Sequence, residues 1–327
     1  MTITPRALAT ISATLFVALL AAPLVQAQTV YPARPITMIV PFPPGGPTDL
    51  VARVLAQTMG SQMGQQIIVD NRGGANGNIG SAAAAKAAPD GYTVLYNTSS
   101  ITLSPALYKS LPYDVMRDLA PVGLAATVPL ALVLNPSVPA NNLKEFIAYA
   151  KANPGKLSYG SAGNGNITHL GAFQLLQANG IDAVHVPYKG SAPADADLVS
   201  GQIHFMTDTV NSVAGFVREK RLKLLAVTTQ KRNDLFPDTP TMAESGMPGF
   251  DVSAWQGLMV PANTPEPIIK RLNAEMSRAL QNPEVLKKLA AQGAIPLGST
   301  PKEYGDYIKS ELTRWAAIVK QTGVSLE

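Results

Sequence analysis

Short β-branched, apolar runs alternate with helical patterns over most of this 327-residue chain. Runs typical of strands occur at residues 36–40, 67–70, 93–96, 132–134, 157–159, 183–186, 203–206 and 224–227. Helical patterns lie between them, beginning at residue 47 and recurring at 82–85, 143–152, 167–178 and 191–200. Strands that alternate with helices of this length predict an α/β fold, with parallel sheets covered by helices on both faces.

The last 60 residues or so have a different pattern. Residues 265–280, 283–291 and 301–319 predict three amphipathic helices, each with a proline near its first turn. Such helices usually cover a sheet, so we expect them to return to the first α/β unit. The chain therefore predicts two lobes with a cleft between them. Lobe 1 comprises residues 28–127 with the C-terminal segment 240–327, and lobe 2 comprises residues 128–239.

The first 27 residues have the order of a secretory signal. Arg6 is followed by the apolar run Leu15–Ala22 and by the small-residue site Val25-Gln26-Ala27. A membrane anchor is the alternative, but the run is short and Pro23 follows it. We expect cleavage after Ala27 and a periplasmic location.

Composition excludes several kinds of chemistry. The chain has no cysteine, so disulfides, thiolate zinc sites and thiol nucleophiles are excluded. Its net charge of +4 is mild and no basic run stands out, so nucleic acid is not an expected partner. His169, His185 and His204 do not have a metal-ligand spacing. No metal or cofactor is expected.

Two glycine-rich loops follow predicted strands, at residues 41–49 and 160–166. In open α/β sheets, ligands bind beyond the carboxyl ends of the strands, where helices begin. Glycines let the backbone approach a ligand closely, and free N–H groups at a helix N-terminus favour an anion. Neither loop contains arginine or lysine. The two loops predict a carboxylate or phosphate site built from backbone groups and hydroxyls.

Enzyme interpretations of these loops fail. Neither has the Gly-Lys-Ser/Thr of a P-loop, and the segment from Gly163 lacks the third glycine of a dinucleotide fingerprint. Ser161 does not have the glycine spacing of a nucleophile elbow. We therefore expect a binding protein and not an enzyme.

Some side chains admit two interpretations. Asp49 could complement the N-terminus of its helix or contact a ligand. Asp208 follows a predicted strand at its carboxyl end, and we place it toward the cleft. A bulky residue at Gly46 is expected to obstruct the ligand and to conflict with the backbone dihedrals of the loop. Tyr108, Tyr113 and Trp255 are expected to be packing residues.

Five segments resemble the signatures of Bug proteins, the periplasmic solute receptors of tripartite tricarboxylate transporters. These segments are 40–49 (VPFPPGGPTD), 69–80 (VDNRGGANGNIG), 159–170 (YGSAGNGNITHL), 185–190 (HVPYKG) and 238–246 (DTPTMAESG). The resemblance extends over essentially all of residues 30–327.

The resemblance implies a two-lobed fold of the periplasmic-binding-protein (Venus flytrap) type, with the C-terminal helices covering lobe 1. It implies capture of a small carboxylate (a di- or tricarboxylate, an aromatic acid or an amino acid) for one large and one small integral membrane subunit. A monomer is expected. Alternatives are the same module acting as a sensor for a membrane signalling partner, or an α/β hydrolase. The candidate ligand-binding residues are Phe42, Pro44, Gly45, Gly46, Thr48, Asp49, Asn97, Ser161, Ala162, Gly163, Asn164, Asn166, His169, Tyr188, Thr207 and Asp208.

Overall fold

The computed structural model describes residues 31–323, 325 and 326, and the described residues from Arg34 onward form one compact unit. Its strands are β1 (Ile36–Val40), β2 (Ile67–Asn71), β3 (Thr93–Thr98), β4 (Leu119–Leu134), β5 (Ser158–Ser161), β6 (Val184–Pro187), β7 (Phe205–Thr209), β8 (Lys223–Val227), β9 (Ser253–Pro261) and β10 (Ile295–Pro296). Its helices are α2 (Pro47–Met63), the 3₁₀ turn η2 (Ala75–Gly77), α3 (Asn78–Ala85), α4 (Ser100–Leu107), α5 (Leu143–Ala152), α6 (Ile167–Asn179), α7 (Ser191–Ser200), α8 (Val210–Arg218), α9 (Glu266–Leu280), α10 (Pro283–Ala291) and α11 (Pro301–Thr322). The predicted signal segment 1–27 lies outside the described residues.

The strands form one mixed sheet in the order β2-β1-β3-β9-β4-β7-β5-β6, with β8 and β10 also paired to β4. Strands β1, β2 and β3 are parallel to one another, as are β5, β6 and β7. Strands β4 and β9 run antiparallel to their neighbours. The α/β class is thus confirmed, whereas the expectation of purely parallel sheets is wrong. Strand β9 and the first half of β4 were not predicted.

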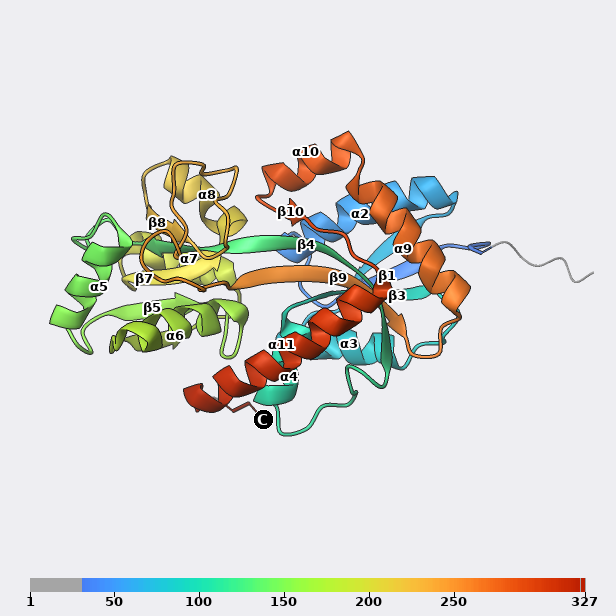
Figure 1. The fold of residues 1–327 in the computed structure, drawn as a ribbon, viewed down its shortest axis with the longest axis horizontal. Helices are drawn as coiled ribbons and strands as arrows, with labels where there is room; N and C mark the ends of the chain where they lie inside the picture. Colours follow the sequence, from blue (N-terminus) through green and yellow to red (C-terminus); the bar gives the residue numbers. More distant parts are fainter. Residues whose placement is uncertain (1–30, 324, 327) are drawn as a thin grey trace, which may run out of the picture. The chain divides into compact units, whose positions relative to one another are not determined.

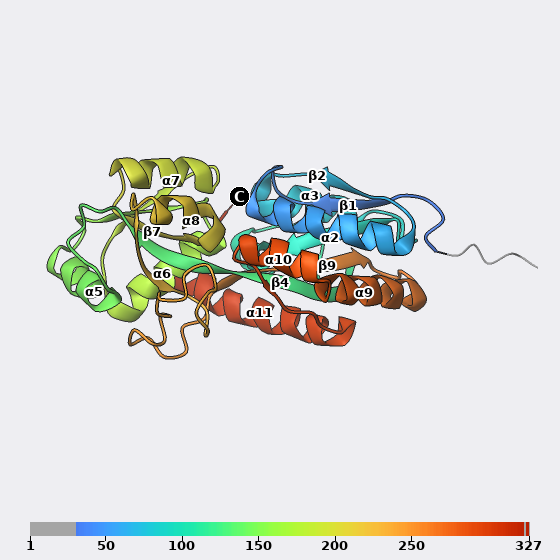
Figure 2. The same cartoon turned by 90° about the horizontal axis from the view of Figure 1, so that it is seen from above.

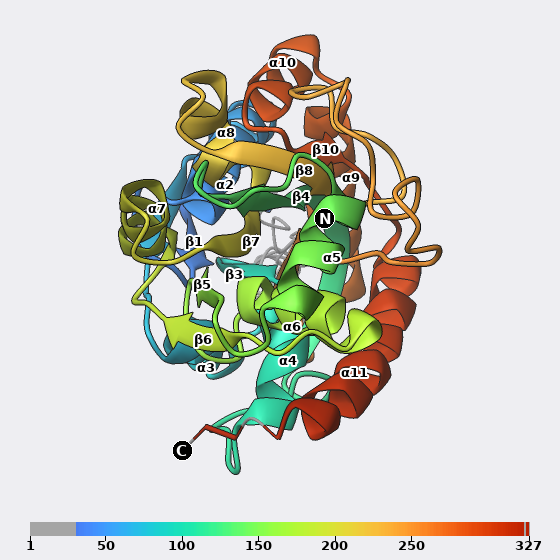
Figure 3. The ribbon, with the colours of Figure 1, turned by 90° about the vertical axis from the view of Figure 1, so that its left-hand side faces the viewer.

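Strand β4 divides the elements into two lobes. Its residues 119–129 pair with β9 and its residues 130–134 with β7 and β8. We use "lobe 1" for β1–β3, α2–α4, β9 and α9–α11, and "lobe 2" for α5–α8 and β5–β8. Figure 1 shows β4 and β9 running between the two groups of elements. Figure 3, seen from the lobe 2 end, shows β5, β6 and β7 among helices α5–α8.

Helices cover the lobe 1 sheet on both faces. Helices α3, α4 and α11 supply a buried cluster with β1, β3 and β9 in which Trp255 lies edge-on to Tyr304. Helix α9 packs on β4, and α2 packs on α9 and α10. Figure 2 shows α2, α10 and α9 together. Trp255 and Tyr113 are buried, which confirms their expected packing role.

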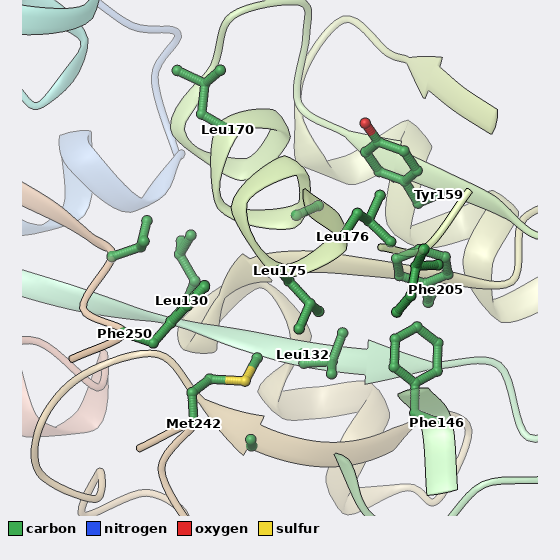
Figure 4. Packing of buried hydrophobic residues seen from close by; sticks show 14 of the residues in the cluster. Leu130, Leu132, Phe146, Tyr159, Leu170, Leu175, Leu176, Phe205, Met242 and Phe250 are labelled. Carbon is green, nitrogen blue, oxygen red and sulfur yellow. The ribbon is translucent and has the colours of Figure 1, made fainter. Parts of the chain in front are cut away.

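The core of lobe 2 forms where β4, β7, α5 and α6 meet. Leu132 of β4, Phe146 of α5 and Phe205 of β7 are fully buried there (Figure 4). The rings of Phe146 and Phe205 meet edge-on with centroids 4.9 Å apart. Helix α6 begins at the cap residue Asn166 and ends at Gly180, whose φ of +61° suits glycine.

Helix α11 contributes to both cores. Tyr304 and Ile308 pack in the lobe 1 cluster, whereas Trp315 and Val319 pack with residues of β4 and α6. In the part of the chain that is described, no helix combines the length and the apolar character needed to span a membrane.

Candidate functional site

The strand register places the carboxyl ends of both parallel groups opposite each other. Thr98, at the end of β3, lies beside Gln256, which is paired with Ala126 of β4. Thr209, at the end of β7, is paired with Leu130 of the same strand. Ala126 and Leu130 are four residues apart on β4, which corresponds to about 13 Å along the strand. The loops that follow β1, β3, β5 and β7 therefore converge on one short stretch of β4.

Asp49 holds the first loop in place. Its buried carboxylate accepts hydrogen bonds from Gly45 N–H at 2.8 Å, Arg53 Nε at 2.8 Å and Asn71 Nδ2 at 2.9 Å. Asn71 Nδ2 also donates to the carbonyl oxygen of Phe42 at 3.1 Å. Burial alone would raise the pKa of Asp49, but the hydrogen bonds outweigh it and lower the pKa. The anionic carboxylate thus fastens the loop to α2 and β2.

The other residues of the first loop lie nearer the surface. Pro44 and Gly45 are exposed, and Phe42, Gly46 and Thr48 are half-buried. Gly45 has φ +79°, so the turn requires glycine there. Gly46 has φ −76°, and a Cβ atom on it would lie an ordinary 3.6 Å from the carbonyl oxygen of Pro43. The expected dihedral conflict at Gly46 is therefore wrong.

A third segment of lobe 1 meets this loop. A Cβ atom built on Gly77 would lie 3.4 Å from both Phe42 Cζ and Ser100 Oγ. Ser100 begins α4, and its Oγ is 2.8 Å from Thr98 Oγ1. Sequence reasoning missed Ser100, although the hydroxyl run of Thr98 at the end of β3 and Ser99 and Ser100 after it is a usable signal.

Asn97 is tied to the interior of lobe 1. It is fully buried, its Oδ1 accepts from Tyr304 Oη at 2.8 Å, and its Nδ2 lies 3.2 Å from Met259 Sδ. Its polar atoms therefore bond to α11 and β9.

The second loop folds around the N-terminus of α6. Asn166 Oδ1 accepts from Thr168 N–H at 3.1 Å, and Thr168 Oγ1 accepts from Ala162 N–H at 2.9 Å. Ser161 is fully buried at the start of the loop, whereas Asn164 is exposed and Ala162 and Gly163 are half-buried.

The second loop also touches lobe 1. Asn166 Nδ2 lies 3.5 Å from Asn76 Oδ1, and Gly165 packs so closely on Leu107 that a Cβ atom there would clash. The structure therefore brings the glycine loop of lobe 2 against η2 and α4 of lobe 1.

Two stacked imidazoles lie behind the second loop. The rings of His169 and His185 are 3.8 Å apart and inclined by only 3°. His169 Nδ1 accepts from Gly165 N–H at 3.2 Å. Burial lowers the pKa of His185 to about 4, and burial together with His185 lowers the pKa of His169 to about 3. Both rings are neutral at physiological pH.

The remaining candidates lie on β7 and before α7. Thr207 is buried and its Oγ1 donates to the carbonyl oxygen of Thr168 at 2.7 Å. Tyr188 Oη donates to Asp197 Oδ2 at 2.7 Å. Asp208 is fully buried; its Oδ1 accepts from Thr209 N–H, its Oδ2 is unpaired among the described residues, and the nearby Ser191 hydroxyl lowers the pKa of the carboxyl in part.

Asp195 of α7 forms an acidic pair with Asp208. It is buried, its Oδ1 also lacks a partner among the described residues, and the two carboxyl groups interact electrostatically. Burial raises the pKa of both groups, and the charge of Asp208 raises that of Asp195 further. Sequence reasoning placed only Asp208 at the site, because no local pattern links these two positions.

The converging loops offer donors for an anion but few charges. Within residues 31–323, 325 and 326, no three His, Asp or Glu side chains are grouped so that they could hold a metal ion. A groove of about 710 Å³ lies along the later part of α2 and the strand β2, lined by residues such as Gln57, Gly60 and Ile68. It includes neither glycine loop, so we place the candidate site at the loops and not in this groove.

Two α/β lobes joined by strands, with loops converging where the parallel strands end, define a two-lobed binding protein. Residues 51–324 match the family model described as "Tripartite tricarboxylate transporter family receptor". The chain belongs to this receptor family. Protein BugT of Bordetella pertussis (strain Tohama I) is 44% identical over 326 residues, which cover 98% of this chain and 99% of BugT.

Solved structures agree with this assignment. The periplasmic binding protein BugD superposes with a TM-score of 0.81 and 37% identity over 91% of this chain and 100% of BugD. Rpa4515 of R. palustris, solved with adipate, has a TM-score of 0.84 and 34% identity over 90% of this chain and 99% of that protein. The family resemblance and the two-lobed fold predicted from the sequence are confirmed.

Proposed function

We propose that this protein captures a small organic carboxylate in the periplasm by closing its two lobes around it. Lobe 1 is assigned to residues 28–127 with 240–327, and lobe 2 to residues 128–239. The captured ligand is delivered to a membrane transporter that has one large and one small integral subunit. The receptor acts as a monomer and catalyses no reaction.

The observation that carries this proposal is the convergence of two glycine loops from opposite lobes on one stretch of β4. Fixed N–H groups and hydroxyls at helix N-termini stabilise a carboxylate without a cationic side chain. The adipate bound by Rpa4515 supports a carboxylate as the class of ligand.

The ligand contacts are assigned to the two loops. In lobe 1, Phe42, Gly46 and Thr48 face the ligand together with Ser100. In lobe 2, residues 161–166 supply the main donors, and Thr207 and Asp208 lie at the far end of the ligand. Asp49 and Asn97 support these contacts from behind, since their polar atoms are occupied by protein partners.

A thermal-shift screen tests this function. The panel consists of adipate, malate, citrate, benzoate and glutamate, with uncharged adipamide as the matched control for adipate. A ligand present at 100 times its dissociation constant stabilises the folded protein by about 2.7 kcal/mol, which is readily detected. We expect at least one carboxylate to raise the melting temperature and adipamide not to do so. A flat response to every carboxylate in the panel would contradict the proposal.

Export is the remaining part of the proposal. Residues 1–27 direct secretion and are removed after Ala27, in line with the periplasmic location of BugD. Mass spectrometry of the protein from its native envelope should find a chain that begins at Gln28. Intact Met1 in the membrane fraction would contradict it.

A further inference from the structure

The hydroxyl group of Ser161 lies close to two groups that could accept its single proton. Ser161 Oγ lies 2.7 Å from His185 Nε2 and 3.1 Å from the carbonyl oxygen of Gly163. The N–H of Gly163 also approaches Oγ, at 3.3 Å. A hydroxyl carries one proton and two lone pairs, so it cannot donate to both His185 and Gly163. The protonation of His185 Nε2 therefore decides where the Ser161 proton can point.

The carbonyl oxygen of Gly163 does not depend on Ser161. It accepts a hydrogen bond from the N–H of Asn166 at 3.2 Å. The Ser161 proton can thus turn toward a ligand without leaving a buried acceptor unpaired, which would otherwise be costly.

The ring of His185 is held in one plane. It stacks on His169 at 3.8 Å and on Tyr159 at 4.9 Å, and Tyr159 is also its partner in the β5–β6 register. These contacts direct Nε2 at Ser161. Because His169 Nδ1 accepts from Gly165 N–H, the proton of the neutral His169 ring is on Nε2.

We propose that His185 is a positioning residue for ligand binding: its Nε2–H donates to Ser161 Oγ, and the Ser161 hydroxyl then donates its proton to a carboxylate oxygen of the ligand. This inference rests on the proposed function of the loop 161–166. In the opposite tautomer, His185 Nε2 accepts a hydrogen bond from the Ser161 hydroxyl, and the Ser161 proton is then not available to the ligand. The relay strengthens the serine as a donor because hydrogen bonds in a chain polarise one another.

A double-mutant cycle tests the relay, with adipate and malate as calorimetric probes. His185→Phe keeps an aromatic ring but removes the donor, and we expect it to weaken binding by about tenfold. His185→Gln restores an N–H near the position of Nε2 and should recover most of this loss. In a Ser161→Ala background, His185→Phe should cost less than about twofold, because the residue through which it acts is gone. If His185→Phe weakens binding by the same factor in the Ser161→Ala background as in the wild type, the proposal is overturned.

The chain supplies a matched control at the other end of β5. His204 Nδ1 lies 3.0 Å from Ser158 Oγ, so a second serine–histidine pair involves β5, at the end of the strand away from Ser161. His204→Phe should lower the melting temperature but leave both affinities unchanged. If it weakens binding as much as His185→Phe does, distortion of β5 explains both results and the relay is wrong.

The tautomer can be observed without a ligand. Long-range ¹H–¹⁵N spectra of ring-labelled protein distinguish the two neutral forms, and the His185→Phe variant assigns the His185 signal. We expect the proton on Nε2, and a proton on Nδ1 would overturn the proposal even if both probes bind. If neither probe binds the wild type, the proposed function fails for these ligands, whereas the spectrum still decides the role of His185.

Discussion

Asp195 and Asp208 form a buried pair of like-charged groups at the site. Each has a carboxylate oxygen without a partner among the described residues, and burial raises the pKa of both groups. A carboxyl whose pKa is raised on folding is favoured while protonated. Its contribution to stability is therefore fully present below the usual carboxyl pKa of about 4 and is lost as the pH rises through the raised value.

Asp195→Asn should reduce this loss. The amide is neutral at every pH, so the repulsion between positions 195 and 208 disappears. We expect the variant to be about 1–2 kcal/mol more stable than the wild type at about pH 8, and nearly equal to it at about pH 4. Denaturant unfolding at several pH values measures this.

Asp182→Asn is the matched control, because Asp182 is exposed in the same lobe. It should leave the pH profile unchanged. An Asp195→Asn variant that keeps the pH dependence of the wild type would show that the Asp195–Asp208 pair does not cause the loss of stability at high pH.

At the scale of elements, α11 contributes to the packing of both lobes. Glu311, which is buried on this helix, accepts hydrogen bonds from Trp255 Nε1 of β9 at 3.2 Å and from Trp315 Nε1 at 2.8 Å. Its N-terminus is fixed by a capping box between Thr300 and Glu303. The helix is thus anchored at the strands that cross between the lobes, and its later turns pack with lobe 2 residues.

Among the described residues, several elements join the two lobes, and Asn233 of lobe 2 donates a hydrogen bond to the carbonyl oxygen of Gly293 of lobe 1 at 3.0 Å. Strands β4 and β9 run between them, the end of α11 packs across, and the loop 161–166 touches η2 and α4. A ligand that contacts both glycine loops stabilises the closed arrangement, because only there are both sets of contacts made.

We therefore expect small-angle X-ray scattering to give a smaller radius of gyration with a saturating carboxylate than without it. The carboxylate is the strongest binder from the thermal-shift panel, and sodium chloride at the same ionic strength is the control. An unchanged radius, with binding verified by calorimetry, would count against closure.

Much of the secondary structure was predictable because local periodicity encodes it. Helices α5, α7 and α10 begin and end where the pattern places them, and β1 has its predicted bounds. Strand β9 was not predictable in this way: Gln256 and Gly257 interrupt its apolar run, and its strand state depends on pairing with β3 and β4. The part of β4 before residue 130 was not predictable for a similar reason, since Pro121, Gly123 and Pro129 disfavour a strand locally.

The sequence by itself determined the two glycine loops, since Gly45 and Gly165 are needed for positive φ angles that other residues rarely adopt. Only the tertiary structure decided which side chains meet there. Asp49 is hydrogen-bonded to Asn71, 22 positions away in the sequence, and Asn97 to Tyr304, 207 positions away. Ser161 is hydrogen-bonded to His185, 24 positions away. No local pattern encodes such pairs, because each depends on the register of strands and on the packing of helices distant in the chain. The backbone of the loops is therefore a local property of this sequence, whereas the direction of its hydrogen bonds is a property of the assembled fold.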